Sequence, residues 1–149
     1  MMLEYILHGE VVSKKNHRIT LPNGKTIPSQ GFRTWHEGAL YQLFCQKRPK
    51  KPLDVPLRLQ CVFIHGTMHR RDSDNQVTSI LDLLQDAKII KDDSWTIINR
   101  IEITNIYKKN ESYCRIYISD FSNSTITYGE KNNERRKQLS DNRLSPHQY

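Results

Sequence analysis

The chain has 149 residues and a formal net charge of +7, with 23 lysines and arginines against 16 aspartates and glutamates. This length is typical of a single domain, and it is enough to bury a core without disulfides or a structural metal. The positive balance favours nucleic acid or another anionic surface as the partner; the alternative is a merely basic protein without such a partner.

The cysteines and the hydropathy pattern exclude two further classes of protein. Cys45, Cys61 and Cys114 lie far apart and form no C-x-x-C pair, which indicates reduced thiols rather than a disulfide scaffold. No apolar run approaches the roughly 18 residues of a membrane span, and no signal-peptide pattern is present. We therefore expect a cytoplasmic protein without a membrane partner.

The first half of the chain predicts a strand, a basic loop, a hairpin and a helix. Apolar and polar residues roughly alternate from Leu3 to Val12, which predicts a strand. A polar, basic loop follows from Ser13 to Arg18. Asn23-Gly24 lies between two short apolar runs and predicts a β-hairpin, because both central residues of a tight turn need positive φ. Apolar residues then recur at helical spacing from about Phe32 to Gln46.

The second half predicts one helix between strands. Pro56 to His65 is apolar on both sides in its second half, as in a central strand. Asp74 is a suitable N-cap for a helix that runs to about Ala87. The stretches Ile97–Tyr107 and Ser112–Ser119 predict two strands that we expect to pair as a β-meander.

This order of elements predicts an α+β fold, with a small mixed sheet packed against two main helices. We expect residues 1–120 to form this domain. The apolar pattern stops after it, so residues 121–149 are predicted to be a polar, basic and flexible tail.

The most informative stretch is Arg70-Arg71-Asp72-Ser73-Asp74-Asn75, together with the pair Asp92-Asp93 that follows the predicted helix. Carboxylates at this density are costly to gather unless a cation holds them. Oxygen ligands without clustered histidine or cysteine favour Mg²⁺, with Mn²⁺ as a substitute, over Zn²⁺. The two arginines would clamp phosphate oxygens. The alternative reading of the D-x-D pattern is a solvent-facing turn with a helix cap.

Asp93 is separated from Asp72 and Asp74 by the predicted helix, which is roughly 20 Å long at about 1.5 Å per residue. It can join them only if the chain doubles back along the helix or if a second subunit supplies it. The sequence leaves both possibilities open.

The run RRDSDNQVTSILDLLQDAKIIKDDSWTI resembles the core motif of the RusA-type Holliday junction resolvases, and SKKNHR resembles that family's loop after the first strand. The resemblance covers roughly residues 3–119. It implies a homodimeric α+β nuclease of bacterial or phage origin that requires Mg²⁺ or Mn²⁺. Such an enzyme nicks two strands of a four-way DNA junction symmetrically, in DNA recombination and repair.

The resemblance also implies roles for individual residues. Asp72, Asp74 and Asp93 match the catalytic, metal-binding aspartates, and Asp92 is a further ligand or a neighbour of one. Asp82 matches an acidic position on the helix. The residues expected to contact DNA are Arg70, Arg71, Lys14, Lys15, Arg18, Asn75 and Lys91.

One position departs from the family. The lysine that commonly stands four residues after the second motif aspartate is replaced by Thr78, one helical turn from Asp74. Lys88 and Lys91 are candidates to replace it in space. The departure supports an alternative function, in which the protein binds branched DNA but cleaves it weakly or not at all.

Overall fold

A computed structural model describes residues 1–15 and 18–121. Most of the predicted tail, from residue 122 to residue 149, therefore lies outside the described residues. The elements in chain order are β1 (Met2–His8), β2 (Arg18–Thr20), β3 (Thr26–Pro28), α1 (Gln30–Phe44), β4 (Leu57–His65), α2 (Ser73–Asp86), β5 (Ile98–Tyr107) and β6 (Tyr113–Asp120).

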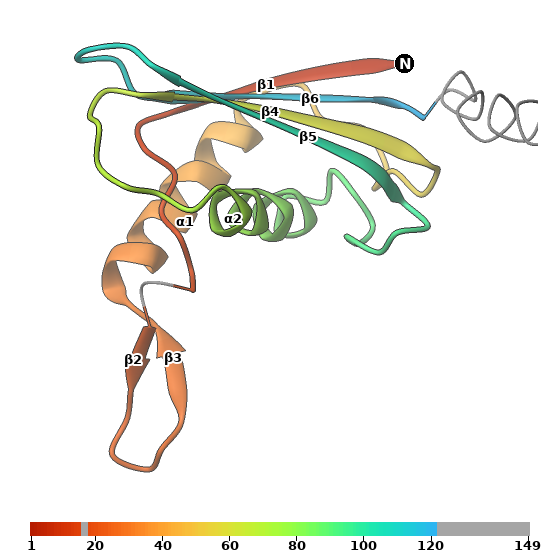
Figure 1. Ribbon diagram of the computed structural model, residues 1–149. Helices are drawn as coiled ribbons and strands as arrows, with labels where there is room; N and C mark the ends of the chain where they lie inside the picture. Colours follow the sequence, from red (N-terminus) through yellow and green to blue (C-terminus); the bar gives the residue numbers. More distant parts are fainter. Residues whose placement is uncertain (16–17, 122–149) are drawn as a thin grey trace, which may run out of the picture.

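Four strands form one mixed sheet in the order β1-β6-β4-β5, and both helices lie on the same side of it (Figure 1). β4 pairs with β5 in parallel and with β6 antiparallel, and β6 pairs with β1 antiparallel. The predicted α+β fold with a small mixed sheet and two main helices is confirmed. None of the helices in the described ranges is long and apolar enough to cross a membrane.

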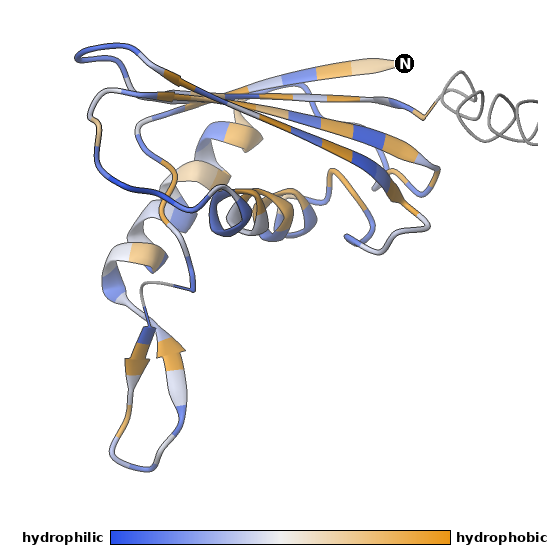
Figure 2. Cartoon of the chain, in the orientation of Figure 1, coloured by the Kyte–Doolittle hydropathy of each residue, from blue (hydrophilic) through white to orange (hydrophobic). Residues whose placement is uncertain are grey.

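The core lies between the sheet and the helices. Alternate residues of β4 are buried, which is the pattern of a strand with one face against a core. The helix α2 turns a hydrophobic side toward the sheet and a hydrophilic side away from it (Figure 2). The main contributions from β4 and α2 are Leu57, Leu59, Cys61, Phe63, Ile80, Leu83 and Leu84.

The cysteines are free thiols, as the sequence predicted. Cys61 and Cys114 are buried in the core, whereas Cys45 is exposed at the end of α1. Burial raises the pKa of the Cys61 thiol to about 12, so this side chain stays protonated and behaves as a small apolar residue.

The strands β5 and β6 do not pair, so the prediction of a β-meander is wrong. β4 lies between them, and the short connection from β5 to β6 crosses the end of β4. At the crossing, Lys108 donates its backbone amide to the carbonyl of His65 at 2.9 Å. A Cβ on Gly66 would lie 2.9 Å from Ser112 Oγ and 3.0 Å from the carbonyl oxygen of Glu111. Glycine at this position therefore permits the crossing that separates the two strands.

The strands β2 and β3 form the hairpin that Asn23-Gly24 predicted. The turn is wider than a two-residue turn, because the amide of Leu21 donates to the carbonyl of Lys25 at 2.8 Å. Gly24 has a φ of 80°, whereas Asn23 has a negative φ, so the expected pair of positive φ angles is not formed. The hairpin projects away from the sheet, beyond one end of α1 (Figure 1).

Candidate functional site

The D-x-D motif lies at the N-terminus of α2, after the loop that follows β4. Asp72, not Asp74 as predicted, is the N-cap residue, and Asp74 lies in the first turn. Their side chains are 47% and 75% exposed. Asn75 Nδ2 lies 3.4 Å from Asp72 Oδ2, in position to orient that carboxylate. The helix start thus presents two carboxylates to solvent.

Two lysines from the loop after β1 lie beside this helix. Lys15 Nζ is 3.9 Å from Asp74 Oδ2, and Lys14 Nζ is 3.3 Å from Asp82 Oδ2. Ser79 fixes the loop against α2: its hydroxyl donates to the carbonyl of Val12 at 2.8 Å. The basic loop and the acidic motif, separated by about 55 residues, are therefore neighbours in space.

Neither Lys88 nor Lys91 takes the place of the lysine that Thr78 replaces. Thr78 Oγ1 donates to the backbone carbonyl of Asp74 at 2.8 Å, so this hydroxyl is used within the helix. Lys91 pairs with Asp54 at 2.8 Å, and Lys88 follows the other end of α2. The cation that the structure places at Asp74 is Lys15, from the N-terminal loop.

Asp92 and Asp93 lie at the opposite end of α2. Backbone hydrogen bonds between Leu53 and both Ile89 and Lys91 hold the preceding segment beside the start of β4, whereas Asp72 follows its end. Nine residues of β4 span roughly 30 Å at about 3.3 Å per residue. Within residues 1–15 and 18–121, no group of three histidine, cysteine or acidic side chains is placed to hold a metal ion.

The carboxylate of Asp92 is hydrogen-bonded within its own loop. Its Oδ1 accepts a hydrogen bond from the amide of Ser94 at 2.8 Å. Hydrogen bonds from the side chain and the backbone of Ser94 hold the pKa of Asp92 below its usual value, so it is ionised at neutral pH. One chain therefore brings Asp72 and Asp74 together but leaves the pair Asp92-Asp93 apart from them.

Glu10, which the sequence did not predict as a site residue, contacts three polar side chains near the motif. Its carboxylate lies 3.0 Å from His65 Nδ1 and 3.3 Å from Arg71 Nε, and it accepts a hydrogen bond from Ser112 Oγ at 3.1 Å. Burial by itself raises the pKa of Glu10, but the His65 hydrogen bond and the Arg71 charge outweigh it, so the pKa is lowered. In the sequence, Glu10 is one acidic residue at the end of a strand, and no local pattern marks it.

The two motif arginines have different surroundings. Arg71 is 21% exposed, pairs with Glu10 and donates to the carbonyls of Thr67 and His69 at 3.3 and 3.0 Å. Arg70 is 93% exposed, and its ion pair with Asp72 is 3.8 Å long. Arg71 therefore shapes the loop that leads to the motif, whereas the guanidinium of Arg70 is open to a phosphate.

A second set of contacts ties β5 to the start of α2. His65 Nε2 lies 2.8 Å from Asn105 Oδ1, and Asn105 Nδ2 donates to Ser73 Oγ at 3.0 Å. These hydrogen bonds link the ends of β4 and β5 to the first residue of the helix. The motif is thus held by the sheet edge rather than by its own loop alone.

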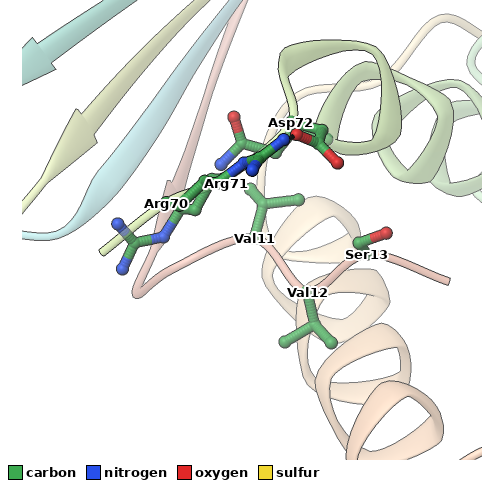
Figure 3. A pocket seen from close by; sticks show the side chains of 7 residues that line it. Val11, Val12, Ser13, Arg70, Arg71 and Asp72 are labelled. Atoms are coloured by element: carbon green, nitrogen blue, oxygen red, sulfur yellow. Dashed lines mark ion pairs between the residues drawn. The ribbon is translucent and has the colours of Figure 1, made fainter. Parts of the chain in front are cut away.

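A cavity of about 250 Å³ opens beside Asp72 (Figure 3). Val11, Val12 and Ser13 line one side of it, and Arg70, Arg71 and Asp72 line the other (Figure 3). The helix residue Gln76 also lines it. The cavity therefore has apolar, cationic and anionic walls directly next to the D-x-D motif.

The two exposed carboxylates fit Mg²⁺ in part. Mg²⁺ commonly binds through one or two carboxylates, several waters and the phosphate oxygens of a substrate. Asp72 and Asp74 supply the carboxylates, and Arg70 and Lys15 offer charge to a phosphate beside them. A third carboxylate is not supplied at this position by the described part of the same chain.

Exposed carboxylates flanked by basic side chains can bind a hard cation and the phosphate oxygens of a nucleic acid backbone. The chain matches the family model described as Endodeoxyribonuclease RusA over residues 8–119 and belongs to that family. Membership implies an endonuclease that resolves Holliday junctions. A search of curated proteins found no match.

Proposed function

We propose that this protein is a Mg²⁺-dependent endonuclease that resolves four-way DNA junctions by paired, symmetric nicks, with Mn²⁺ as a substitute cofactor. The observation that carries the proposal is the site at the start of α2, where Asp72 and Asp74 stand beside Lys15 and Arg70. This site combines ligands for a hard cation with groups that bind a phosphodiester.

Each side chain has a distinct part in the proposed reaction. Asp72 and Asp74 hold the cation, and Asn75 orients Asp72. Mg²⁺ held by these two carboxylates would supply an activated water and would offset charge on the phosphodiester. Lys15 places an ammonium where negative charge develops on the phosphate, which is where a fixed cation lowers the barrier.

The remaining basic residues position the DNA. The side chain of Arg70 is 93% exposed, and in this proposal it contacts the backbone next to the scissile phosphate. Lys14, Arg18 and Lys91 add contacts further away, which are salt-sensitive and carry no sequence information.

We also propose that the active protein is a homodimer in which Asp93 of one copy completes the site of the other. The edge strand β5 supports this arrangement, since on one side it pairs with no strand of the described residues. Its side chains Ile101, Ile103 and Tyr107 are 42%, 37% and 50% exposed. Antiparallel pairing of two such edges about a twofold axis places the start of one strand opposite the end of the other.

Such pairing of two β5 strands would bring Asp93 of one copy towards the D-x-D motif of the other. Asp93 precedes the start of β5, whereas Asn105, near its end, contacts Ser73 beside the D-x-D motif. Two copies joined in this way form two equivalent sites. A twofold enzyme with two sites suits the two symmetric nicks of a four-way junction.

The first test is cleavage of a labelled four-way junction compared with a linear duplex of the same sequence. The reactions contain Mg²⁺, Mn²⁺ or a chelator, and Asp74→Asn is the control variant. We expect paired nicks in the junction alone, only with a metal ion, and none with the variant. Nicks that persist in chelator or in Asp74→Asn would refute the proposed site.

A second candidate function is branched-DNA binding with weak cleavage. Thr78 favours it, because this residue has no ammonium group and its hydroxyl is bonded to the helix backbone. The test compares Thr78→Lys with Lys15→Gln. If Lys15 supplies the missing charge, Lys15→Gln lowers single-turnover cleavage by about 100-fold, as expected for loss of one preorganised charge. If Thr78→Lys instead raises cleavage strongly and Lys15→Gln has no effect, the native protein is principally a binding protein.

A further inference from the structure

The side chain of Gln76 is buried and makes no hydrogen bond to the described part of the chain. This residue is the fourth residue of α2 and is 2% exposed. Neither its Nε2 nor its Oε1 has a hydrogen-bond partner among the residues that the structure describes. An unpaired buried carboxamide lowers the stability of a fold, and leucine or methionine of similar size would avoid this cost.

The helix itself does not force this state. Gln85, on the same helix, donates its Nε2 to the carbonyl of Leu81 at 3.2 Å. Gln76 instead lines the cavity beside Asp72, together with the segment Val11–Ser13 and the two motif arginines. Gln76, whose carboxamide is unpaired among the described residues, and the motif aspartate therefore line the same cavity.

The chemistry of the carboxamide restricts what can satisfy it. Gln76 offers two N–H donors and one carbonyl acceptor. Phosphate oxygens would pair with the amide nitrogen but leave the carbonyl without a donor. The edge of a nucleobase presents a donor and an acceptor side by side, and glutamine pairs in this two-bond manner with adenine.

The size and walls of the cavity suit one base. Its volume of about 250 Å³ lies below the roughly 300–1,000 Å³ of sites for drug-sized ligands. Val11 and Val12 supply an apolar surface for a ring face, and guanidinium groups stack on bases. Arg70 has a single long ion pair, with Asp72 at 3.8 Å, so this wall can move to admit a ligand.

We infer that this cavity is a subsite for one unstacked nucleobase next to the cleaved phosphate, and that Gln76 determines sequence specificity by hydrogen bonding to the edge of that base. The inference rests on the proposed junction-cleaving function and adds base recognition at the same site. Unpaired bases are available at the branch point of an opened junction, and their hydrogen-bonding edges are then accessible.

The test compares Gln76→Leu and Gln76→Met with the native protein. The substrates are four-way junctions that differ only in the bases flanking the nick, including one with an abasic site. Native protein is expected to prefer one base. Both variants are expected to cleave the preferred junction about 10- to 100-fold more slowly and to lose the preference, as for loss of a two-bond base contact. Gln85→Leu, which removes a paired amide from the same helix, is the matched control and keeps the preference.

Stability provides an independent readout. Because the carboxamide is unpaired, Gln76→Leu and Gln76→Met are expected to raise the urea midpoint of unfolding while they lower cleavage. A lower midpoint in both variants would mean that water already pairs with the carboxamide, and this would overturn the inference. Higher stability with an unchanged base preference would overturn it as well.

Failure of the proposed function can be separated from failure of the subsite. In chelator, the side-chain amide signal of ¹⁵N-labelled Gln76 is followed by NMR while single-stranded oligonucleotides of each base are added. A shift with one base, absent with an abasic strand, supports the subsite even if no junction is cut. No shift with any base overturns it, whatever the junction assay shows.

Discussion

The proposed sharing of the active site between two copies makes a quantitative prediction for mixed dimers. One chain places Asp74 and Asp93 at opposite ends of α2, which spans 14 residues, or roughly 20 Å at about 1.5 Å per residue. If each site takes Asp74 from one copy and Asp93 from the other, a dimer of Asp74→Asn and Asp93→Asn chains has one doubly mutated site and one intact site. If each site lies within one chain, both sites of the mixed dimer carry a lesion.

Subunit exchange between equal amounts of the two variants gives about half mixed dimers, so about a quarter of all sites are intact in the shared arrangement. Each variant alone is expected to be inactive. The assay uses a supercoiled plasmid with an extruded cruciform, in which a single nick gives an open circle and paired nicks give a linear product. We expect the mixture to recover nicking at about a quarter of the native level, almost all of it as open circles. An inactive mixture, with exchange verified by differently tagged chains, would refute the shared site and show that Asp93 acts within its own chain or not at all.

Three further predictions follow from single contacts. Arg70→Gln is expected to reduce the slope of log K against log salt for junction binding in chelator by about 0.9, whereas Arg71→Gln leaves it unchanged because Arg71 is paired with Glu10; equal slopes for both variants would contradict this division. Gly66→Ala is expected to lower the free energy of unfolding by about 1–3 kcal/mol through the contacts of the added Cβ, whereas Gly38→Ala, with nothing within 4 Å in α1, raises it by about 1 kcal/mol. The pKa of Glu10 is lowered in the folded protein, so the stability that its carboxylate contributes is complete above the unfolded pKa of about 4.3 and is lost as the pH falls through the lower folded pKa. The urea midpoint of unfolding should therefore fall more steeply with acid for the native protein than for Glu10→Gln. Parallel curves for the two proteins would argue against this linkage.

Most elements of the fold follow from local patterns. The apolar stripe of α2, the buried alternation of β4 and the Asn23-Gly24 turn depend on residues close together in the chain, and each lies where the sequence predicted it. The pairing of β5 and β6 was predicted wrongly, because strand order depends on which surfaces pack together and not on connection length. The absence of a side chain at Gly66 lets the chain cross the end of β4 and leaves β5 at the edge.

For the candidate site too, some features follow from local sequence and others depend on the tertiary structure. Local sequence was sufficient to predict the D-x-D motif at a helix start, the basic loop and the family resemblance, because each depends on a short run of neighbouring residues. Only the tertiary structure placed Lys15 beside Asp74, and it left Asp93 at the far end of α2.

The tertiary structure also sets which side chains are paired with others and which are free to bind a ligand. The sequence does not distinguish Arg70 from Arg71, but the fold pairs Arg71 with Glu10 and leaves Arg70 exposed. Glutamine is usually a surface residue, yet the packing of α2 buries Gln76 beside the cavity, where no residue within 1–15 and 18–121 pairs with its carboxamide. The physical reason is that burial, charge pairing and hydrogen bonding depend on residues distant in the chain, whose arrangement is set by the packing of the whole core.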